Sequence, residues 1–221
     1  MKRKIAIFDL DGTLIDAYKA IRDTVNYCLE KLGYPPVSLE TTKKVVGRGD
    51  KDLAKRIVKE EDIASFISLY RENHIRFLDG NLKLMEGAEA LLIYLKKKNV
   101  YIAVATNRAS FSIIPVIERL NIKDYFDIIY TADNVEKPKP DPEMIFKILQ
   151  IFNIKKEQSF FVGDMDIDYL TGKNAGIDTY IVSTGSSPKE ELERYSDIKV
   201  FDNLTCLKKY LTTKLVVSNK K

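Results

Sequence analysis

The sequence predicts an α/β fold, in which a doubly wound, mostly parallel sheet is interrupted by an inserted all-helical segment. Short apolar segments rich in Ile, Val, Phe and Tyr recur along the chain, and runs of this length suit strands that are covered on both faces. Helical patterns separate most of these segments, and strands that alternate with helices form parallel sheets through right-handed crossovers. Residues 16–82 break this alternation because they contain helical patterns only.

Six strands and three core helices are expected from these patterns. The strands are expected at residues 4–9, 100–106, 128–131, 159–164, 178–183 and 198–201. The helices are expected at residues 86–98, 142–152 and 166–175. The last of these helices is followed by Gly176, which is the residue type most often found just after a helix ends.

The inserted segment is expected to form four helices. An apolar stripe from Ile21 to Leu32 predicts the first, residues 38–46 the second, and Asp50 and Asp62 stand where they would cap the third and fourth. A helical bundle inserted after the first strand of such a core suggests a lid over the strand ends, with hinges near residues 14–17 and 81–86. The expected organisation is a core of residues 1–15 and 83–221 and a helical cap domain of residues 16–82.

Composition narrows the class of protein. With 45% hydrophobic and 31% charged residues among 221, the chain is globular, not disordered. The net charge is +4, but the basic residues are scattered among the acidic ones, which argues against nucleic-acid binding. No apolar run reaches membrane-spanning length, because charged or polar residues interrupt each one. Two isolated cysteines, Cys28 and Cys206, suit free thiols in a reducing compartment. We expect a cytoplasmic monomer or homodimer with no membrane partner.

Polar side chains gather where the expected strands end. They are Asp9 and Asp11 after the first strand, Thr106, Asn107 and Arg108 after the second, Lys137 in the proline-rich segment after the third, and Asp164, Asp166 and Asp168 after the fourth. Ligands of open α/β sheets bind beyond the carboxyl ends of the strands. Each residue alone is a weak signal, since Asp is common after strands and Thr and Asn cap helices. Together they predict one polar site.

These residues resemble the four motifs of the haloacid dehalogenase-like hydrolase superfamily. The matching segments are Asp9-Leu10-Asp11-Gly12-Thr13, Thr106, Lys137 before a proline, and Gly163-Asp164-Met165-Asp166-Ile167-Asp168. They occur in the family's order and span essentially the whole chain. The helical insertion falls where the subgroup that resembles phosphoglycolate phosphatases has its cap. The resemblance implies a Rossmann-like core and a phosphatase that acts on a small phosphorylated metabolite.

The resemblance also implies a role for each motif. Asp9 would attack phosphorus and form an aspartyl-phosphate, while Asp11 would protonate the leaving oxygen and then deprotonate the hydrolytic water. Thr106 and Lys137 would hold phosphate oxygens. Further donors would come from the turn at Gly12 and Thr13 and from Asn107.

A magnesium ion is part of the same implication. A carboxylate is a poor nucleophile toward a phosphate dianion unless charge is neutralised, and Mg²⁺ does this because it prefers oxygen ligands and bridges carboxylates to phosphate. Asp9 and Asp164 would bind Mg²⁺ through their side chains and Asp11 through its backbone carbonyl. Asp168 would bind it directly or through water.

Several assignments stay open at the level of sequence. In Gly47-Arg48-Gly49-Asp50-Lys51, Arg48 or Lys51 would meet a second anionic group of the substrate, or the segment is a solvated turn. Arg108 is a further candidate to meet an anionic group of the substrate. Asp166 is either a third metal ligand or a residue stabilised at a helix N-terminus, and His74 is better explained by packing than by catalysis.

Other functions are compatible with parts of this pattern. A pyrophosphatase would use the positive charge of residues 47–51 for a second phosphate, and a sugar phosphomutase would share Asp9 and Asp11. A dehalogenase is disfavoured because carbon–halogen displacement needs neither an acid at Asp11 nor Mg²⁺. Because fold alone does not fix function, the chain could also be a non-catalytic binding protein that kept the fold. The complete set of motifs opposes this alternative.

Overall fold

A single parallel sheet forms the centre of the computed structural model, which describes residues 4–218. Its six strands run in the order β5-β4-β1-β6-β7-β8, and every neighbouring pair is parallel. The strands are β1 (Ile5–Phe8), β4 (Tyr101–Thr106), β5 (Ile128–Thr131), β6 (Ser159–Gly163), β7 (Asp178–Val182) and β8 (Lys199–Phe201). Each lies within a residue or two of its expected position, and the predicted fold class is confirmed.

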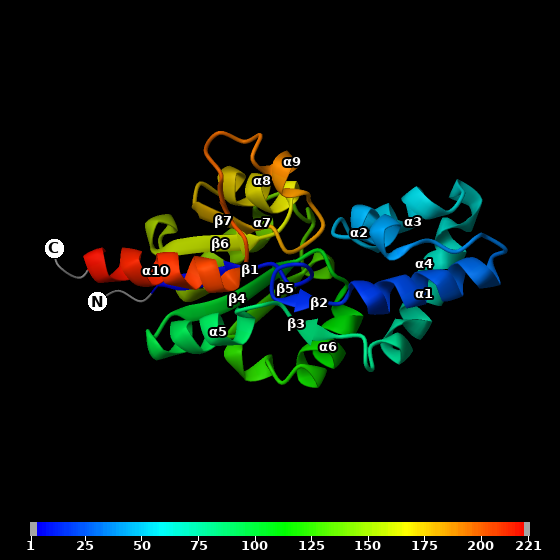
Figure 1. The fold of residues 1–221 in the computed structure, drawn as a ribbon, viewed down its shortest axis with the longest axis horizontal. Helices are drawn as coiled ribbons and strands as arrows, with labels where there is room; N and C mark the ends of the chain where they lie inside the picture. The colour runs from blue at the N-terminus through cyan, green and yellow to red at the C-terminus, as the bar shows by residue number, and fades with distance from the viewer. Residues whose placement is uncertain (1–3, 219–221) are drawn as a thin grey trace.

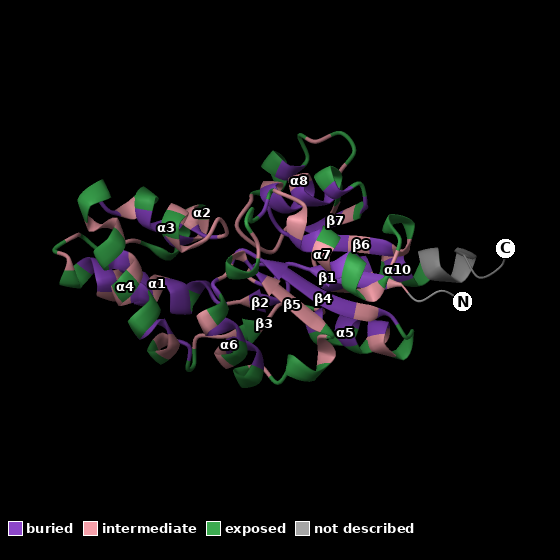
Figure 2. Ribbon diagram, turned by 180° about the vertical axis from the view of Figure 1, so that it is seen from behind, coloured by how far each residue is buried: buried purple, intermediate pink, exposed green. Residues whose placement is uncertain are grey.

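Helices cover both faces of this sheet (Figure 1). Those on one face are α5 (Ala88–Lys97), α6 (Ile113–Arg119) and α10 (Leu204–Ser218); those on the other are α7 (Glu143–Phe152) and α8 (Asp166–Ala175). Strand β1 alternates between the two layers, because Ala6 and Phe8 pack with the first set and Ile5 and Ile7 with the second. Figure 2 shows the central strands as almost wholly buried.

Shorter elements complete the core. Helix α9 is Lys189–Leu192, and single 3₁₀ turns lie at Ser110–Ser112, Lys123–Tyr125, Ala132–Asn134 and Lys156–Gln158.

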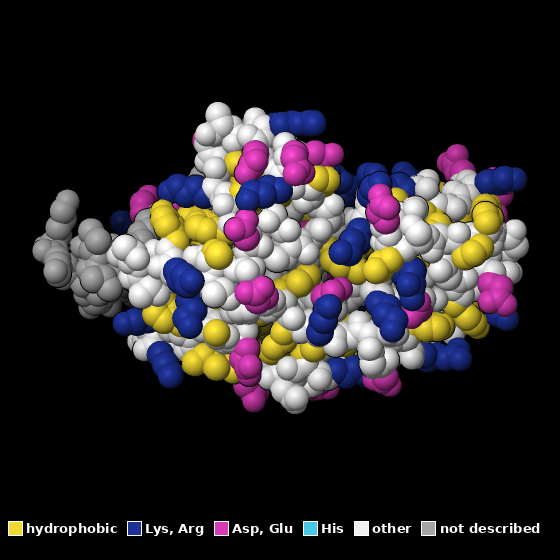
Figure 3. All heavy atoms as spheres, viewed as in Figure 1, with side chains coloured by type: hydrophobic (Ala, Val, Ile, Leu, Met, Phe, Trp, Pro, Cys, Tyr) yellow, Lys and Arg dark blue, Asp and Glu magenta, His cyan; other side chains and the backbone are white. Residues whose placement is uncertain are grey.

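Lysine, arginine and acidic side chains are interspersed over the described part of the face in Figure 3. Within residues 4–218, no helix combines the length and the apolar content that crossing a membrane requires.

The helical insertion lies to one side of the sheet, beyond its carboxyl edge (Figure 1). Its elements are α1 (Tyr18–Lys31), α2 (Leu39–Val45), α3 (Asp50–Ile57), η1 (Glu60–Asp62), α4 (Ile63–Asn73) and η2 (His74–Phe77). At its root, β2 (Ile15–Asp16) pairs antiparallel with β3 (Lys83–Leu84). This ribbon was not anticipated, and it brings the outgoing and returning chains together where hinges were expected.

The fourth inserted helix, α4, ends before the apolar stripe in its sequence does. The stripe continues through Phe77 and Leu78, but α4 ends at Asn73 and a 3₁₀ turn follows. The side-chain amide of Asn73 donates a hydrogen bond of 2.8 Å to the carbonyl of Leu69. Such side-chain bonds compete with the backbone ladder at helix ends. His74 therefore begins a new turn, and its ring stacks on Tyr70 with centroids 4.9 Å apart.

Candidate active site

Three buried carboxylates meet at the carboxyl edge of the central strands. Asp9 follows β1, Asp164 follows β6, and Asp168 lies in the first turn of α8; one oxygen from each lies within 4.8 Å of the others. The backbone of Asp9 is fixed to the neighbouring strand, because its N–H donates to the carbonyl of Val162 at 2.8 Å. The parallel pairing of β1 with β6 thus brings residues 155 positions apart into one cluster.

Lys139 supplies the positive charge of this cluster. Its Nζ lies 2.7 Å from Oδ1 of Asp9 and 2.7 Å from Oδ1 of Asp168, and only 1% of its side chain is exposed. Burial opposes the ammonium form, but the two carboxylates outweigh it and hold the pKa of Lys139 above its ordinary value. The side chain is therefore a fixed cation beside Asp9.

The expectation that Lys137 takes this place is corrected. The Lys137 side chain is exposed, and its backbone N–H donates to Glu143 Oε2 at 2.9 Å. The side chain of Asn107 fixes the backbone of Lys139 through two hydrogen bonds. Its Oδ1 accepts from the Lys139 N–H at 3.0 Å, and its Nδ2 donates to the Lys139 carbonyl at 3.1 Å. Both lysines precede a proline, so the Lys-Pro pattern did not separate them. In the sequence, Lys139 differs from Lys137 only in lying closer to the start of α7.

Asp164 is oriented by two donors. Thr13 Oγ1 donates to its Oδ1 at 3.0 Å and the Ser186 N–H donates to its Oδ2 at 2.8 Å. Burial, together with Asp168 and Asp9, raises the pKa of the Asp164 carboxyl. The Thr13 side chain is fully buried and holds Asp164.

Two glycines let the backbone come close to Asp164. A Cβ on Gly12, whose φ is +84°, would lie 2.5 Å from Asp164 Oδ2, and a Cβ on Gly185 would lie 1.7 Å from it. Gly185 and Ser186 belong to the turn after β7, which the sequence analysis did not include in the site. Their signal was weak: a Gly-Ser pair after a strand is common in loops.

Asp168 is tied into the cluster through both oxygens. Oδ1 accepts from Lys139, and Oδ2 accepts from the N–H groups of Asp164 and Met165 at 3.1 Å each. Burial raises the pKa of Asp168 to about 6, against the opposing effect of Lys139. Asp9, Asp164 and Asp168 face one ammonium, which leaves an excess of negative charge when they are ionised. Buried carboxylate oxygens with excess negative charge fit a Mg²⁺ ion, and these residues would hold it.

Asp11 points away from this cluster, toward Arg108. Arg108 Nη1 lies 2.8 Å from Oδ1 and 2.9 Å from Oδ2 of Asp11, with 6% of the arginine and 12% of the aspartate side chain exposed. Arg108 Nε also donates to Ser112 Oγ at 2.9 Å. Burial opposes the guanidinium charge, but Asp11 outweighs it, so the pKa of Arg108 is raised. Arg108 and Asp11 therefore form a buried two-point ion pair.

His74 contacts the other end of the guanidinium. Arg108 Nη2 lies 2.6 Å from His74 Nε2, and since arginine only donates, Nε2 must be the unprotonated nitrogen. His74 Nδ1 then carries the hydrogen and donates to Thr24 Oγ1 at 2.9 Å, while the Thr24 hydroxyl donates to the Ala20 carbonyl at 2.7 Å. Burial and the charge of Arg108 lower the pKa of His74 to about 2. The ring is a neutral acceptor, a role that its packed position in the sequence did not reveal.

This depressed pKa predicts how stability depends on pH. Below the ordinary histidine pKa the unfolded chain takes up a proton that His74 in the folded chain refuses, so folding stability falls as pH falls. We expect the stability of the wild type relative to His74→Gln to decrease below about pH 6.5, by up to about 1.4 kcal/mol per pH unit, and to stay constant above it. Urea unfolding of both proteins across this range measures the difference. If the free energies of unfolding of the two proteins changed with pH in the same way, His74 would not have a lowered pKa in the folded protein.

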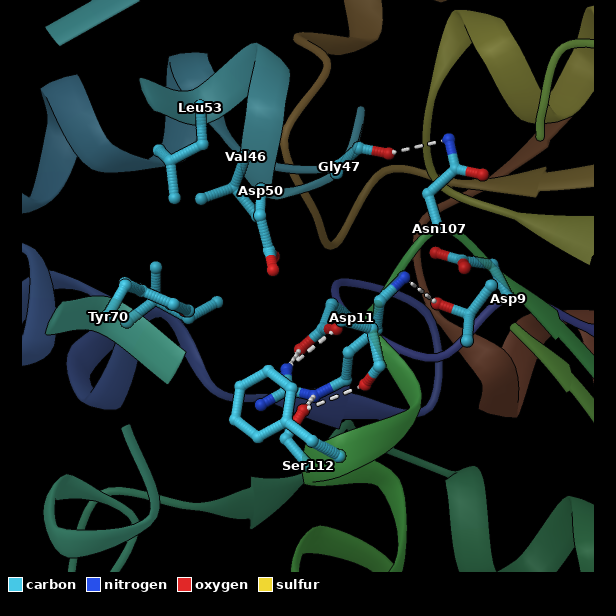
Figure 4. Close-up of a pocket in the computed structure, with 15 residues that line it drawn as sticks. Asp9, Asp11, Val46, Gly47, Asp50, Leu53, Tyr70, Asn107 and Ser112 are labelled. Carbon is cyan, nitrogen blue, oxygen red and sulfur yellow. Dashed lines mark hydrogen bonds and ion pairs between the residues drawn. The ribbon is translucent and has the colours of Figure 1, made fainter. Parts of the chain in front are cut away.

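A cavity of about 50 Å³ lies between the strand ends and the helical insertion. Its walls are Asp9, Asp11, Ile21, Val46, Gly47, Gly49, Asp50, Leu53, Tyr70, Thr106, Asn107, Arg108, Ala109, Phe111 and Ser112. Figure 4 shows Asp9 and Asp11 on one side of the space and Asp50, Leu53 and Val46 on the other. Thr106, Asn107 and Arg108 line the same cavity as Asp9.

Arg48 does not line this cavity, which disfavours the alternative in which it meets a second anionic group of the substrate. Its Nη2 lies 2.8 Å from Asp166 Oδ2, which joins the helical insertion to the start of α8. Lys51 is exposed on α3. Asp166 is correspondingly a helix-terminal residue outside the cluster of Asp9, Asp164 and Asp168. A second contact holds the insertion on the core, because Asn107 Nδ2 donates to the Gly47 carbonyl at 3.2 Å (Figure 4).

Comparisons with known proteins agree with this geometry. The family model described as haloacid dehalogenase-like hydrolase matches residues 6–182. A phosphoglycolate phosphatase of Aquifex aeolicus is 30% identical over 207 residues, which cover 90% of this chain and 97% of the relative. A phosphoglycolate phosphatase of Pseudomonas fluorescens is 29% identical over 217 residues, covering 92% of this chain and 78% of the relative.

Solved structures share the fold. A predicted phosphoglycolate phosphatase from Haemophilus somnus superposes with a TM-score of 0.87 at 21% identity, covering 96% of this chain and 99% of the other. CbbY from Rhodobacter sphaeroides, solved in complex with phosphate, superposes with a TM-score of 0.77 at 20% identity, covering 92% and 95%. At these identities the likeness concerns the fold alone.

Proposed function

The chain belongs to the haloacid dehalogenase-like hydrolase family and is a phosphatase, and we propose that it hydrolyses a small phosphorylated metabolite of the phosphoglycolate type with the help of Mg²⁺. One observation carries the proposal. Asp9, a buried carboxylate with its own fixed ammonium at 2.7 Å, forms part of the wall of a cavity of about 50 Å³ between the strand ends and the helical insertion. The names of the curated relatives point to the same substrate class.

The proposed reaction begins with attack of Asp9 on phosphorus, which forms an aspartyl-phosphate and releases the alcohol. Lys139, next to Asp9, and Thr106, on the cavity wall, would hold phosphate oxygens. Asp11 would give a proton to the leaving oxygen and later take one from the hydrolytic water. Held by Asp9, Asp164 and Asp168, with the backbone carbonyl of Asp11 as a proposed ligand, Mg²⁺ would neutralise charge on the phosphate.

We assign residues 16–82 to a cap domain and residues 1–15 and 83–221 to the core. Two features support the assignment. The insertion joins the core through the short β2–β3 ribbon, and it contacts the strand ends through Arg48–Asp166 and Gly47–Asn107. A cap that closes in this way would exclude water and favour small substrates.

The pyrophosphatase alternative loses the observation that favoured it. It required positive charge from residues 47–51 for a second phosphate, but Arg48 pairs with Asp166 and Lys51 is exposed. Asp50, a negative residue, faces the cavity instead.

A cytoplasmic location and a monomeric or homodimeric state remain predictions.

A screen of phosphate esters tests the proposed function. We expect release of phosphate from p-nitrophenyl phosphate with Mg²⁺ and loss of release with excess chelator, followed by restoration when Mg²⁺ is added back. Among metabolites, kcat/KM should be highest for phosphoglycolate and much lower for pyrophosphate and hexose phosphates. Activity that is insensitive to chelator contradicts the metal assignment, and phosphoryl transfer to a sugar in place of water would indicate a phosphomutase.

A further inference from the structure

We propose that Arg108, positioned by His74, recognises a carboxylate on the leaving group, and that this carboxylate is on the carbon that bears the ester oxygen. The preferred substrates are then phosphate esters of small 2-hydroxy acids. The inference rests on the proposed phosphatase function and deepens it, since it names the group that distinguishes good substrates from poor ones.

The charge of the cavity favours a carboxylate over a second phosphate. Among the described residues that line it, Arg108 is the only cation, whereas Asp9, Asp11 and Asp50 are acidic. The wall formed by Val46, Leu53 and Phe111 is apolar. A second phosphate would bring more negative charge than one guanidinium offsets, while a carboxylate is a monoanion whose two oxygens match the guanidinium fork.

Arg108 would lose its carboxylate partner during the proposed reaction. Asp11 holds the guanidinium at 2.8 and 2.9 Å in this structure, but its proposed task requires it to turn toward the leaving oxygen. Arg108 would then be a buried cation without a carboxylate partner, because its other side-chain contacts, Ser112 and His74, are neutral. An unpaired buried charge is unfavourable. A carboxylate brought by the substrate replaces Asp11 and removes this cost.

The positions of Asp11 and Arg108 limit the spacing within the substrate. Asp11 follows β1 and Arg108 follows the neighbouring strand β4, so the groups that they bind must be close together even after the Asp11 side chain turns to the leaving oxygen. In an ester of a 2-hydroxy acid, one carbon separates the ester oxygen from the carboxylate. Moving the carboxylate one carbon further away would take it out of register with Arg108.

His74 makes Arg108 ready for this role without changing the charge of the cavity. It accepts one Nη2 hydrogen as a neutral ring, and Thr24 fixes the ring through Nδ1. His74 belongs to the helical insertion and Arg108 to the loop after β4. Arg108 is therefore fully oriented only when the insertion sits on the core, which makes His74 a positioning residue.

The test compares three esters: phosphoglycolate, 2-hydroxyethyl phosphate, which lacks the carboxylate, and 3-phosphooxypropanoate, in which it is one carbon further away. For the wild type we expect kcat/KM to be at least about 100-fold higher for phosphoglycolate than for either of the others. Arg108→Gln should reduce this ratio at least about 30-fold, mainly through KM, and Arg108→Lys should reduce it less. Arg119→Gln, which removes the same charge from a surface arginine paired with Asp79, should leave the ratio unchanged.

His74→Gln has a separate signature. It should raise KM for phosphoglycolate and leave KM for 2-hydroxyethyl phosphate unchanged, because only the first ester uses Arg108. Thermal unfolding of each variant separates this from a general loss of fold. Equal losses on both esters would reduce His74 to a structural role and overturn its assignment.

Two outcomes overturn the inference as a whole. A folded Arg108→Gln enzyme that loses activity equally on all three esters would show that Arg108 only holds Asp11. A wild type that hydrolyses all three esters equally would show that no carboxylate is read, whatever the variants do. Failure of the proposed function looks different, since no ester would then be hydrolysed in the presence of Mg²⁺.

Discussion

Replacing Asp9 by Asn should lower kcat for phosphate-ester hydrolysis by at least about 10⁴-fold. The amide is nearly the same size as the carboxylate but is not a nucleophile, so an aspartyl-phosphate cannot form. Lys139 keeps its contact of 2.7 Å with Asp168, and the backbone of Asp9 remains bound to Val162. We therefore expect the fold and Mg²⁺-dependent substrate binding to be retained.

Steady-state phosphate release and thermal unfolding measure the two halves of this prediction. Asp202→Asn is the matched control, because it makes the same change at an exposed aspartate paired with Lys189, and it should behave as the wild type. Mass spectrometry of the purified Asp9→Asn protein excludes reversion by deamidation. Hydrolysis within a few-fold of the wild-type rate would remove Asp9 as the nucleophile.

The centre of the sheet could be predicted almost completely because its strands β1, β4 and β6 are buried on both faces. Ile5 to Phe8 are all fully buried, so the sequence shows one uninterrupted apolar run, and the polar residue after it marks the end of the strand. Ile128–Thr131 was also located to the residue, although it is an edge strand in which only Thr131 is fully buried. The β2–β3 ribbon escaped detection because it is two residues long on each side, too short for any periodicity.

Side-chain partners in the site followed from the sequence less well. Thr13 and Asp164 are 151 positions apart and Arg48 and Asp166 are 118 apart, and no local pattern encodes such pairings. Arg48 and Arg108 are both plausible ligands for an anion by residue type. Only the orientation of the helical insertion on the core decides that Arg108 lines the cavity and Arg48 does not.

Lys139→Met should be nearly as damaging as the loss of the nucleophile. It removes the ammonium that contacts Asp9 and Asp168 and leaves a buried carboxylate cluster without a cation. We expect phosphatase activity to fall by at least about 10²- to 10³-fold, because charge on the transferred phosphoryl group loses a fixed stabiliser. Without divalent cation the free energy of unfolding should also fall, by about 3–5 kcal/mol for a broken buried pair.

Lys137→Met is the matched control, since it removes the same side chain two residues earlier in the same proline-rich segment. Lys137 is exposed and only its backbone N–H is engaged, so activity should stay within about two-fold and stability within about 0.5 kcal/mol of the wild type. The reverse result, with Lys137→Met inactive and Lys139→Met active, would restore the register suggested by the first Lys-Pro pair. Added Mg²⁺ should recover part of the stability of Lys139→Met but little of its activity, because a divalent cation can offset the carboxylates without replacing the hydrogen bond that Lys139 would give to the phosphate in the proposed reaction.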